Sequence, residues 1–70
     1  MPYLIAMNAN ELKEHRAALG LTGDQLSAVL GVAPRTARRW ENGQVPVPPV
    51  VALAVRLLRQ VPADQWPRHD

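Results

Sequence analysis

The sequence contains no cysteine, which excludes disulfide bonds and thiolate metal sites. A chain without such crosslinks depends on core packing, and we expect it in a reducing, cytoplasmic compartment. Long apolar runs are also missing. The longest, residues 3–7 and 50–55, fall far short of the ~20 residues that a bilayer span requires. We therefore expect a soluble protein that makes no membrane contact.

Groupings of residues that carry catalysis are missing as well. His15 and His69 have no Cys, Asp or His at a spacing that suits metal ligands. Ser27 and the acidic residues form no nucleophile or acid–base set, and no GxGxxG or phosphate-binding loop pattern occurs. We therefore expect that the protein is not an enzyme and that it binds no metal, cofactor or small-molecule ligand.

The net positive charge is small, but the basic residues are concentrated in the second half of the chain. The formal net charge is +2, yet residues 34–59 alone carry five Arg against one Glu. Seven of the eight basic residues are Arg, the side chain suited to bidentate contact with phosphate and with guanine edges. This composition favours a nucleic-acid partner, although a solvated basic helix face would look the same, so the positions of the Arg residues must decide.

Seventy residues are at most one domain, with a thin margin of stability. We divide it into an apolar N-terminal arm (residues 1–7), a helical domain (8–61) and a C-terminal tail (62–70). The first helix is expected to start at Asn8 or Asn10, both good N-caps, and to end at about Leu19. Thr22 and Gln25, three residues apart, predict a capping box at the start of a second helix.

The second helix is expected to end at about Leu30, before a glycine suited to a tight turn. Pro34 then fits the first position of a third helix, which runs to about Asn42, although Ala33 before it is a poor N-cap. A fourth helix is expected over about 48–60. No segment reads as a strand, and the tail has room for one short turn.

The third helix has few apolar residues. Ala37 and Trp40 form one narrow stripe, which we expect in the core, so the remaining side chains project outward: Arg35, Thr36, Arg38 and Arg39. Two helices joined by a short turn containing Gly, the second of them short and basic, form the helix-turn-helix arrangement that places a recognition helix in the major groove of DNA.

Almost all of the fourth helix is apolar, and we expect it to pack on both sides. One stripe is predicted to face the core: Val50, Leu53, Ala54, Leu57 and Val61. A second stripe would remain in water in a monomer, and we predict that it forms a dimer interface with help from Tyr3, Leu4 and Ile5: Val51, Val55 and Leu58. Trp66 either covers this helix or lies in a subunit contact.

Residues 19–43, LGLTGDQLSAVLGVAPRTARRWENG, resemble the phage-repressor and Cro-like family of DNA-binding domains, often called the XRE family. The likeness extends over residues 12–58. It rests on Leu12-x3-Arg16-x2-Leu19-Gly20-Leu21-Thr22, on Leu26-x3-Leu30-Gly31-Val32 and on Arg39-Trp40-Glu41-Asn42-Gly43. The resemblance implies an all-α, lambda-repressor-like helix-turn-helix domain of four to five helices.

The resemblance also implies roles for individual residues. The base-reading positions fall on Pro34, Arg35, Thr36 and Arg39, with Arg38 nearest the DNA backbone or a flanking base. We favour Arg35 and Arg39, which lie one helical turn apart and can each bind guanine with two hydrogen bonds. Phosphate contacts are implied at the start of the second helix and after the third: Thr22, Gly23, Asn42, Gly43 and Gln44. Arg16 and Glu41 correspond to a partly buried ion pair.

The sequence departs from the family pattern at four positions. Gly23 stands where Gln usually contacts a phosphate, and Ala33 replaces the usual Ser or Thr cap. Pro34 stands where many relatives read adenine with Gln, and its ring offers only an apolar contact, for example to a thymine methyl group. Ala37 replaces a larger aliphatic core residue. Base recognition is therefore expected to shift toward the Arg residues.

We interpret the chain as a bacterial or phage-encoded, nucleoid-associated regulator that binds double-stranded DNA. A homodimer on a near-palindromic operator, repressing by promoter occlusion, is the expected mode of action. Two alternatives remain open on the sequence alone. The chain could be the antitoxin of a toxin–antitoxin pair, or a helix-turn-helix domain used only for protein interaction.

Overall fold

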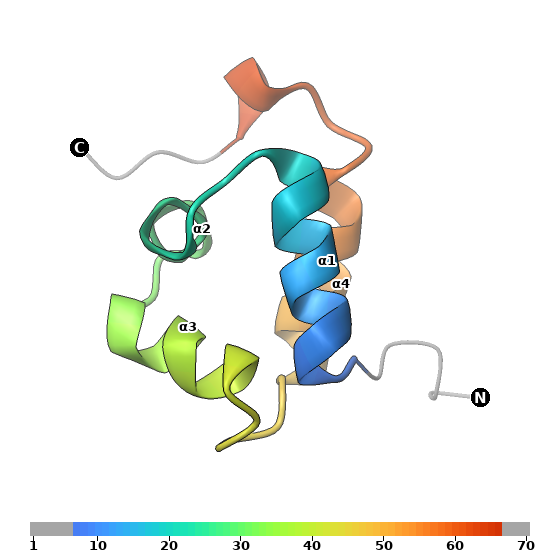
Figure 1. Cartoon of the computed structure of the whole chain (residues 1–70). Coiled ribbons are helices and arrows are strands. Elements are labelled where there is room, and N and C mark those ends of the chain that lie inside the picture. The colour runs from blue at the N-terminus through green and yellow to red at the C-terminus, as the bar shows by residue number, and fades with distance from the viewer. Residues whose placement is uncertain (1–6, 67–70) are drawn as a thin grey trace.

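The computed structural model describes residues 7–66, which form an all-α domain without strands in that range (Figure 1). The expected fold class is therefore confirmed. In chain order the elements are α1 (Ala9–Leu19), α2 (Gly23–Leu30), α3 (Pro34–Glu41), α4 (Pro49–Leu58) and the short 3-10 helix η2 (Ala63–Gln65). No helix among these is long and apolar enough to cross a membrane.

Capping boxes start the first two helices. The side chain of Asn8 accepts a hydrogen bond from the backbone N–H of Glu11 (2.8 Å), whose carboxylate accepts one from the N–H of Asn8 (2.9 Å). Thr22 and Gln25 form the same reciprocal pair at α2, with distances of 3.1 and 2.9 Å. Both helices therefore begin where side chains satisfy donors that the helix itself cannot. Asn8, and not Asn10, is the cap of α1.

Glycines end α1 and α2. Gly31 has a φ of 76°, a left-handed conformation that costs little only for glycine. Its N–H donates to the carbonyl of Ala28 (3.2 Å), and the N–H of Val32 donates to that of Ser27 (3.0 Å). The chain thus reverses within residues 31–33 and enters α3 directly. This is the short turn expected between the two helices of the motif.

The start of α3 has no side-chain cap. Ala33 occupies the N-cap position with φ −68° and ψ 144°, an extended conformation that suits a capping residue, but its methyl group accepts no hydrogen bond. Pro34 follows at the first helical position. The first turn of α3 therefore lacks the side-chain acceptor that α1 and α2 have.

Replacing Ala33 with Ser is expected to raise the free energy of unfolding by about 1 kcal/mol, because the hydroxyl would accept a hydrogen bond from the first turn. Urea denaturation measures this change. Ala28→Ser, at an exposed position inside α2, is the matched control and should be neutral or slightly destabilising. Equal effects of the two substitutions would show that the missing cap has no energetic cost.

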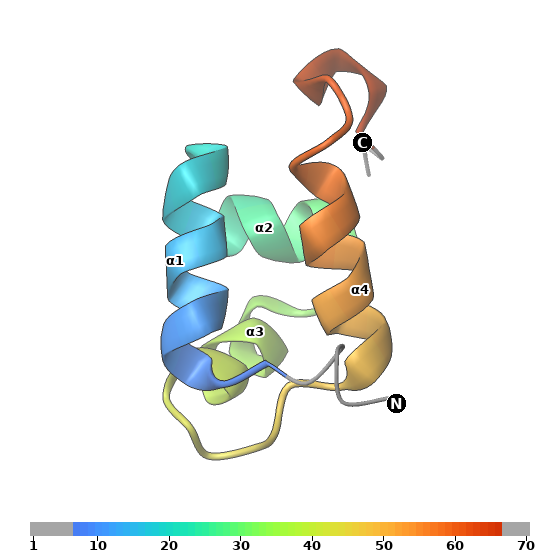
Figure 2. The ribbon, with the colours of Figure 1, turned by 90° about the vertical axis from the view of Figure 1, so that its right-hand side faces the viewer.

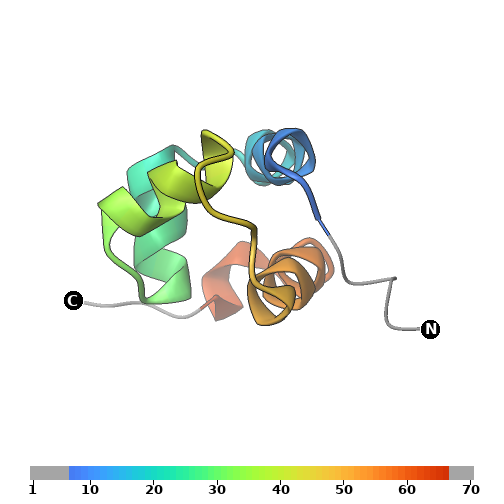
Figure 3. The ribbon, with the colours of Figure 1, turned by 90° about the horizontal axis from the view of Figure 1, so that it is seen from below.

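The four helices are arranged as two pairs. Helices α1 and α4 lie side by side with their N-terminal ends at the same end of the molecule (Figure 2). Helices α2 and α3 pack against each other on the other side, and the link of residues 42–48 crosses from one pair to the other (Figure 3). The buried residues between them form one core: Met7, Leu12, Leu26, Ala37, Trp40, Val47, Val51, Ala52, Val55 and Leu58.

Of the N-terminal arm (residues 1–7), the structure describes only the last residue. That residue, Met7, is only 7% exposed and belongs to the core. The other apolar residues of that arm, Tyr3, Leu4 and Ile5, lie outside the described residues, as does His69. Met7 therefore packs with the helical domain that follows it.

The predicted orientation of α4 is wrong. The stripe expected at a dimer interface is buried in the monomer, with Val51 9%, Val55 0% and Leu58 9% exposed. The stripe expected in the core is largely exposed instead: Val50, Leu53, Leu57 and Val61, with Ala54 intermediate. An almost wholly apolar helix has no polar face to fix its rotation, so hydrophobic periodicity could not choose between two stripes. Packing against the other helices determines which side of α4 is buried.

Trp66 covers the end of α4. Its indole N–H lies 3.1 Å from the carbonyl oxygen of Leu58 and 2.9 Å from that of Val61, and it donates to both. The side chain is half-buried and packs against the core. Of the two interpretations offered by the sequence, the structure shows the first: Trp66 covers the helix, and it donates to the carbonyl of Leu58, the last residue of α4.

Candidate nucleic-acid interface

Helix α3 is anchored by two buried residues and presents five others to solvent. Ala37 and Trp40 are 1% and 5% exposed and bind the helix to the core. Four other side chains are exposed and one is half-buried: Pro34, Arg35, Arg38, Arg39 and, half-buried, Thr36. All five predicted base-reading residues therefore lie on the accessible part of one helix, which carries three guanidinium groups and ends at a single acid.

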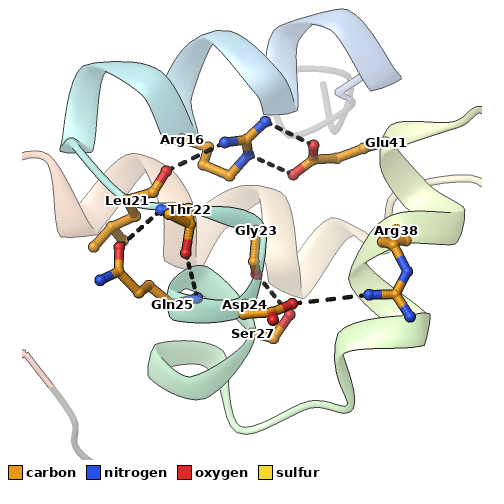
Figure 4. Close-up of polar contacts among 9 residues, drawn as sticks. All are labelled: Arg16, Leu21, Thr22, Gly23, Asp24, Gln25, Ser27, Arg38 and Glu41. Atoms are coloured by element: carbon orange, nitrogen blue, oxygen red, sulfur yellow. Dashed lines mark hydrogen bonds and ion pairs between the residues drawn. The ribbon is translucent and has the colours of Figure 1, made fainter.

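That acid, Glu41, is held by α1. The Nε of Arg16 lies 2.9 Å from one carboxylate oxygen of Glu41, and the Nη2 lies 3.1 Å from the other (Figure 4). The remaining Arg16 nitrogen donates to the carbonyl of Leu21 (3.2 Å). The side chains of Arg16 and Glu41 are 26% and 12% exposed. The bidentate pair therefore ties the C-terminal end of α3 to α1 and to the turn before α2.

A second ion pair joins α2 to α3. The Nη1 of Arg38 lies 3.8 Å from the Oδ1 of Asp24, and both side chains are largely exposed (Figure 4). The sequence did not predict this contact. No spacing rule connects residues on different helices across a turn, so only the packing of α2 on α3 reveals it.

The side chains of Arg35 and Arg39 have no hydrogen bond or ion pair within residues 7–66. The other Arg residues in that range all have partners. Arg59, for example, lies 3.1 Å from the Nδ1 of His15. Arg35 and Arg39 are therefore the two guanidinium groups whose donors are all available, and both belong to α3.

The start of α2 offers backbone donors. The capping box uses the N–H groups of Thr22 and Gln25, which leaves those of Gly23 and Asp24 at a helix N-terminus without an intrahelical partner. A Cβ built on Gly23 would meet nothing within 4 Å. Packing therefore does not require glycine there, and its absent side chain leaves the first amide of α2 open to approach.

The turn after α3 offers less than expected. The N–H groups of Asn42, Gly43 and Gln44 donate to carbonyls of α3 at 2.9, 3.3 and 3.0 Å. Asn42 and Gln44 keep exposed side chains that could donate to phosphate. Gly43 has no side chain and a φ of 77°, so its role is to turn the backbone. The phosphate contact that the resemblance implied for Gly43 stays a prediction.

The described part of the chain holds no cluster of three or more His, Asp or Glu side chains suited to a metal ion. What the site offers chemically is donors: guanidinium groups on α3, amides at α2 and side-chain amides after α3. Such an arrangement binds anionic and hydrogen-bond-accepting surfaces.

Comparison with known proteins agrees with this description. A family model described as a helix-turn-helix domain matches residues 9–65, which is most of the chain. No curated protein and no solved structure gives a significant match. Domains of this kind typically place their second motif helix in the major groove of DNA, which implies DNA as the partner. The chain belongs to the family of helix-turn-helix domains.

Proposed function

We propose that the protein is a sequence-specific regulator of transcription, of the XRE type, that inserts α3 into the major groove of double-stranded DNA. The observation that carries this proposal is the pair of unpartnered guanidinium groups, Arg35 and Arg39, on the exposed side of a helix fixed by Ala37 and Trp40. Each guanidinium can bind the O6 and N7 of guanine through two hydrogen bonds. The operator is therefore expected to contain guanine at two positions of each half-site.

Phosphate contacts would fix the register of α3. The hydroxyl of Thr22 and the amides of Gly23 and Asp24 lie at the N-terminus of α2, where the helix dipole favours an anion. The exposed side chains of Asn42 and Gln44 follow the C-terminal end of α3. These two sets of donors, one at the start of α2 and one after α3, would hold the DNA backbone on either side of the base-reading residues.

Selection of bound fragments from a random pool of duplexes tests this function. The expected consensus contains guanines at a fixed spacing, repeated with two-fold symmetry if the protein binds as a dimer. Failure to retain any duplex at low salt would contradict DNA binding and favour the alternative of a protein-interaction module. If the consensus overlaps a promoter, the bound protein would repress transcription by occluding it.

The dimer is proposed on the exposed stripe of α4, which replaces the predicted one. Val50, Leu53 and Leu57 are 71%, 46% and 51% exposed, and Val61 continues the stripe beyond the helix. The stripe carries no charge, so a second copy could pack the same residues against it around a two-fold axis. The domain measures 31 × 27 × 17 Å. Two such domains side by side suit recognition helices about 34 Å apart, one turn of DNA.

Leu53→Glu is expected to convert a dimer into a monomer, because it places a charge in the middle of this stripe without entering the core. Sedimentation velocity at micromolar concentration measures the change. Ala17→Glu, at an exposed position on α1, adds the same charge elsewhere and should leave the dimer intact. A wild type that sediments as a monomer would reject this interface and leave the stripe for a different protein, as in the antitoxin alternative.

A further inference from the structure

The ion pair between Asp24 and Arg38 lies beside the proposed DNA-binding surface and has no clear structural role. The two groups are 3.8 Å apart, and their side chains are 77% and 64% exposed. The helices they join are already packed together through buried residues, among them Leu26 and Ala37. A loose, exposed pair adds little to the stability of such a contact.

The position of Asp24 is unfavourable for binding DNA. It is the second residue of α2, so its carboxylate lies in the helix turn whose free amides would receive a phosphate (Figure 4). It is also the only acidic residue in residues 7–66 that pairs with an Arg of α3's exposed face. Glu41, the other acid near α3, pairs with Arg16 of α1.

We propose that Asp24 competes with the DNA backbone for Arg38 and thereby lowers the affinity of the protein for all duplexes. In the free protein the carboxylate holds the guanidinium, and on DNA a phosphate replaces it. The inference rests on the proposed function, because Arg38 can meet a phosphate only if α3 lies on DNA. Base recognition by Arg35 and Arg39 is left untouched, since neither of them has an acidic partner in the described chain.

A titration of two duplexes, the selected consensus and a scrambled duplex of equal length, tests this. Asp24→Asn is expected to tighten binding to both by the same factor at 50 mM salt. The gain should shrink at 200 mM salt, because salt screens the exposed carboxylate that competes with the phosphate. Asp64→Asn removes the same charge from the exposed 3-10 helix η2 and is the matched control.

The Arg38→Ala background separates the proposed route from a general effect of charge. There, Asp24→Asn should lose most of its gain, because no guanidinium remains to be released. A gain equal to that of Asp64→Asn, a gain kept in full in the Arg38→Ala background, or a change confined to one base pair would each overturn the inference. If the wild type binds neither duplex, the proposed function itself fails and the inference falls with it. Thermal melting checks that all variants are folded.

Discussion

Arg35→Ala and Arg39→Ala are each expected to weaken binding to the selected duplex by about 1–3 kcal/mol, which is roughly 5- to 150-fold in Kd. Each substitution removes a fork of donors that has no partner within the described chain. The preference at one base pair should relax at the same time, because the lost contact distinguishes guanine from the other bases. Titration against duplexes changed at single positions measures both effects.

The substitutions Arg35→Lys and Arg39→Lys sharpen this test. Lysine keeps the charge but cannot present two parallel donors, so most of the discrimination should be lost while the sequence-independent part of binding remains. Lys13→Ala, at an exposed position on α1, removes a cation away from α3 and should change neither. If an Arg→Ala variant weakens every duplex by one common factor, that residue contacts phosphate and its base-reading role is wrong.

Arg16→Ala or Glu41→Ala is expected to lower the free energy of unfolding by about 2–3 kcal/mol, between the values typical of exposed and of buried pairs. Each single substitution leaves the other charge half-buried without its bidentate partner. Arg16→Ala should be the more destabilising of the two, because it leaves Glu41 unpaired and a carboxylate in the last turn of α3 also opposes the helix dipole. In a domain of this size, such a loss is a large part of the total stability.

A double-mutant cycle measured by urea denaturation separates the pair from its surroundings. The double variant should be more stable than the sum of the single losses predicts. The pair Asp24–Arg38 is the control within the same molecule, and its coupling energy should be near zero because both partners are largely exposed. Strictly additive losses at Arg16 and Glu41 would contradict a stabilising pair.

The sequence predicted the helices and their ends well, because these depend on neighbouring residues. Thr22 and Gln25 can reach each other in only one local geometry, and Gly31 suits a left-handed turn wherever it lies. Helix ends differed from the predictions by one or two residues, which is the usual uncertainty of such boundaries. The exposed Arg residues of α3 followed from the narrow stripe of Ala37 and Trp40.

The orientation of α4 could not be predicted in the same way. Hydrophobic contrast fixes the rotation of a helix, and in α4 only Arg56 provides it. The choice of Val51 and Val55 as the inner stripe depends on the shape of the space left by the other helices. The two hydrogen bonds of Trp66 and the contact between Asp24 and Arg38 are similarly the result of tertiary packing, for which a single sequence carries no local signal.

The way in which α3 is attached has a consequence for evolution and for engineering. Of its eight residues only Ala37 and Trp40 are buried, and its entry is fixed by the backbone of residues 31–33 together with Pro34. Substitutions at Arg35, Arg38 and Arg39 therefore leave the folding of the domain almost unchanged. New operators can be acquired by altering those surface positions, while the scaffold beneath them is inherited intact.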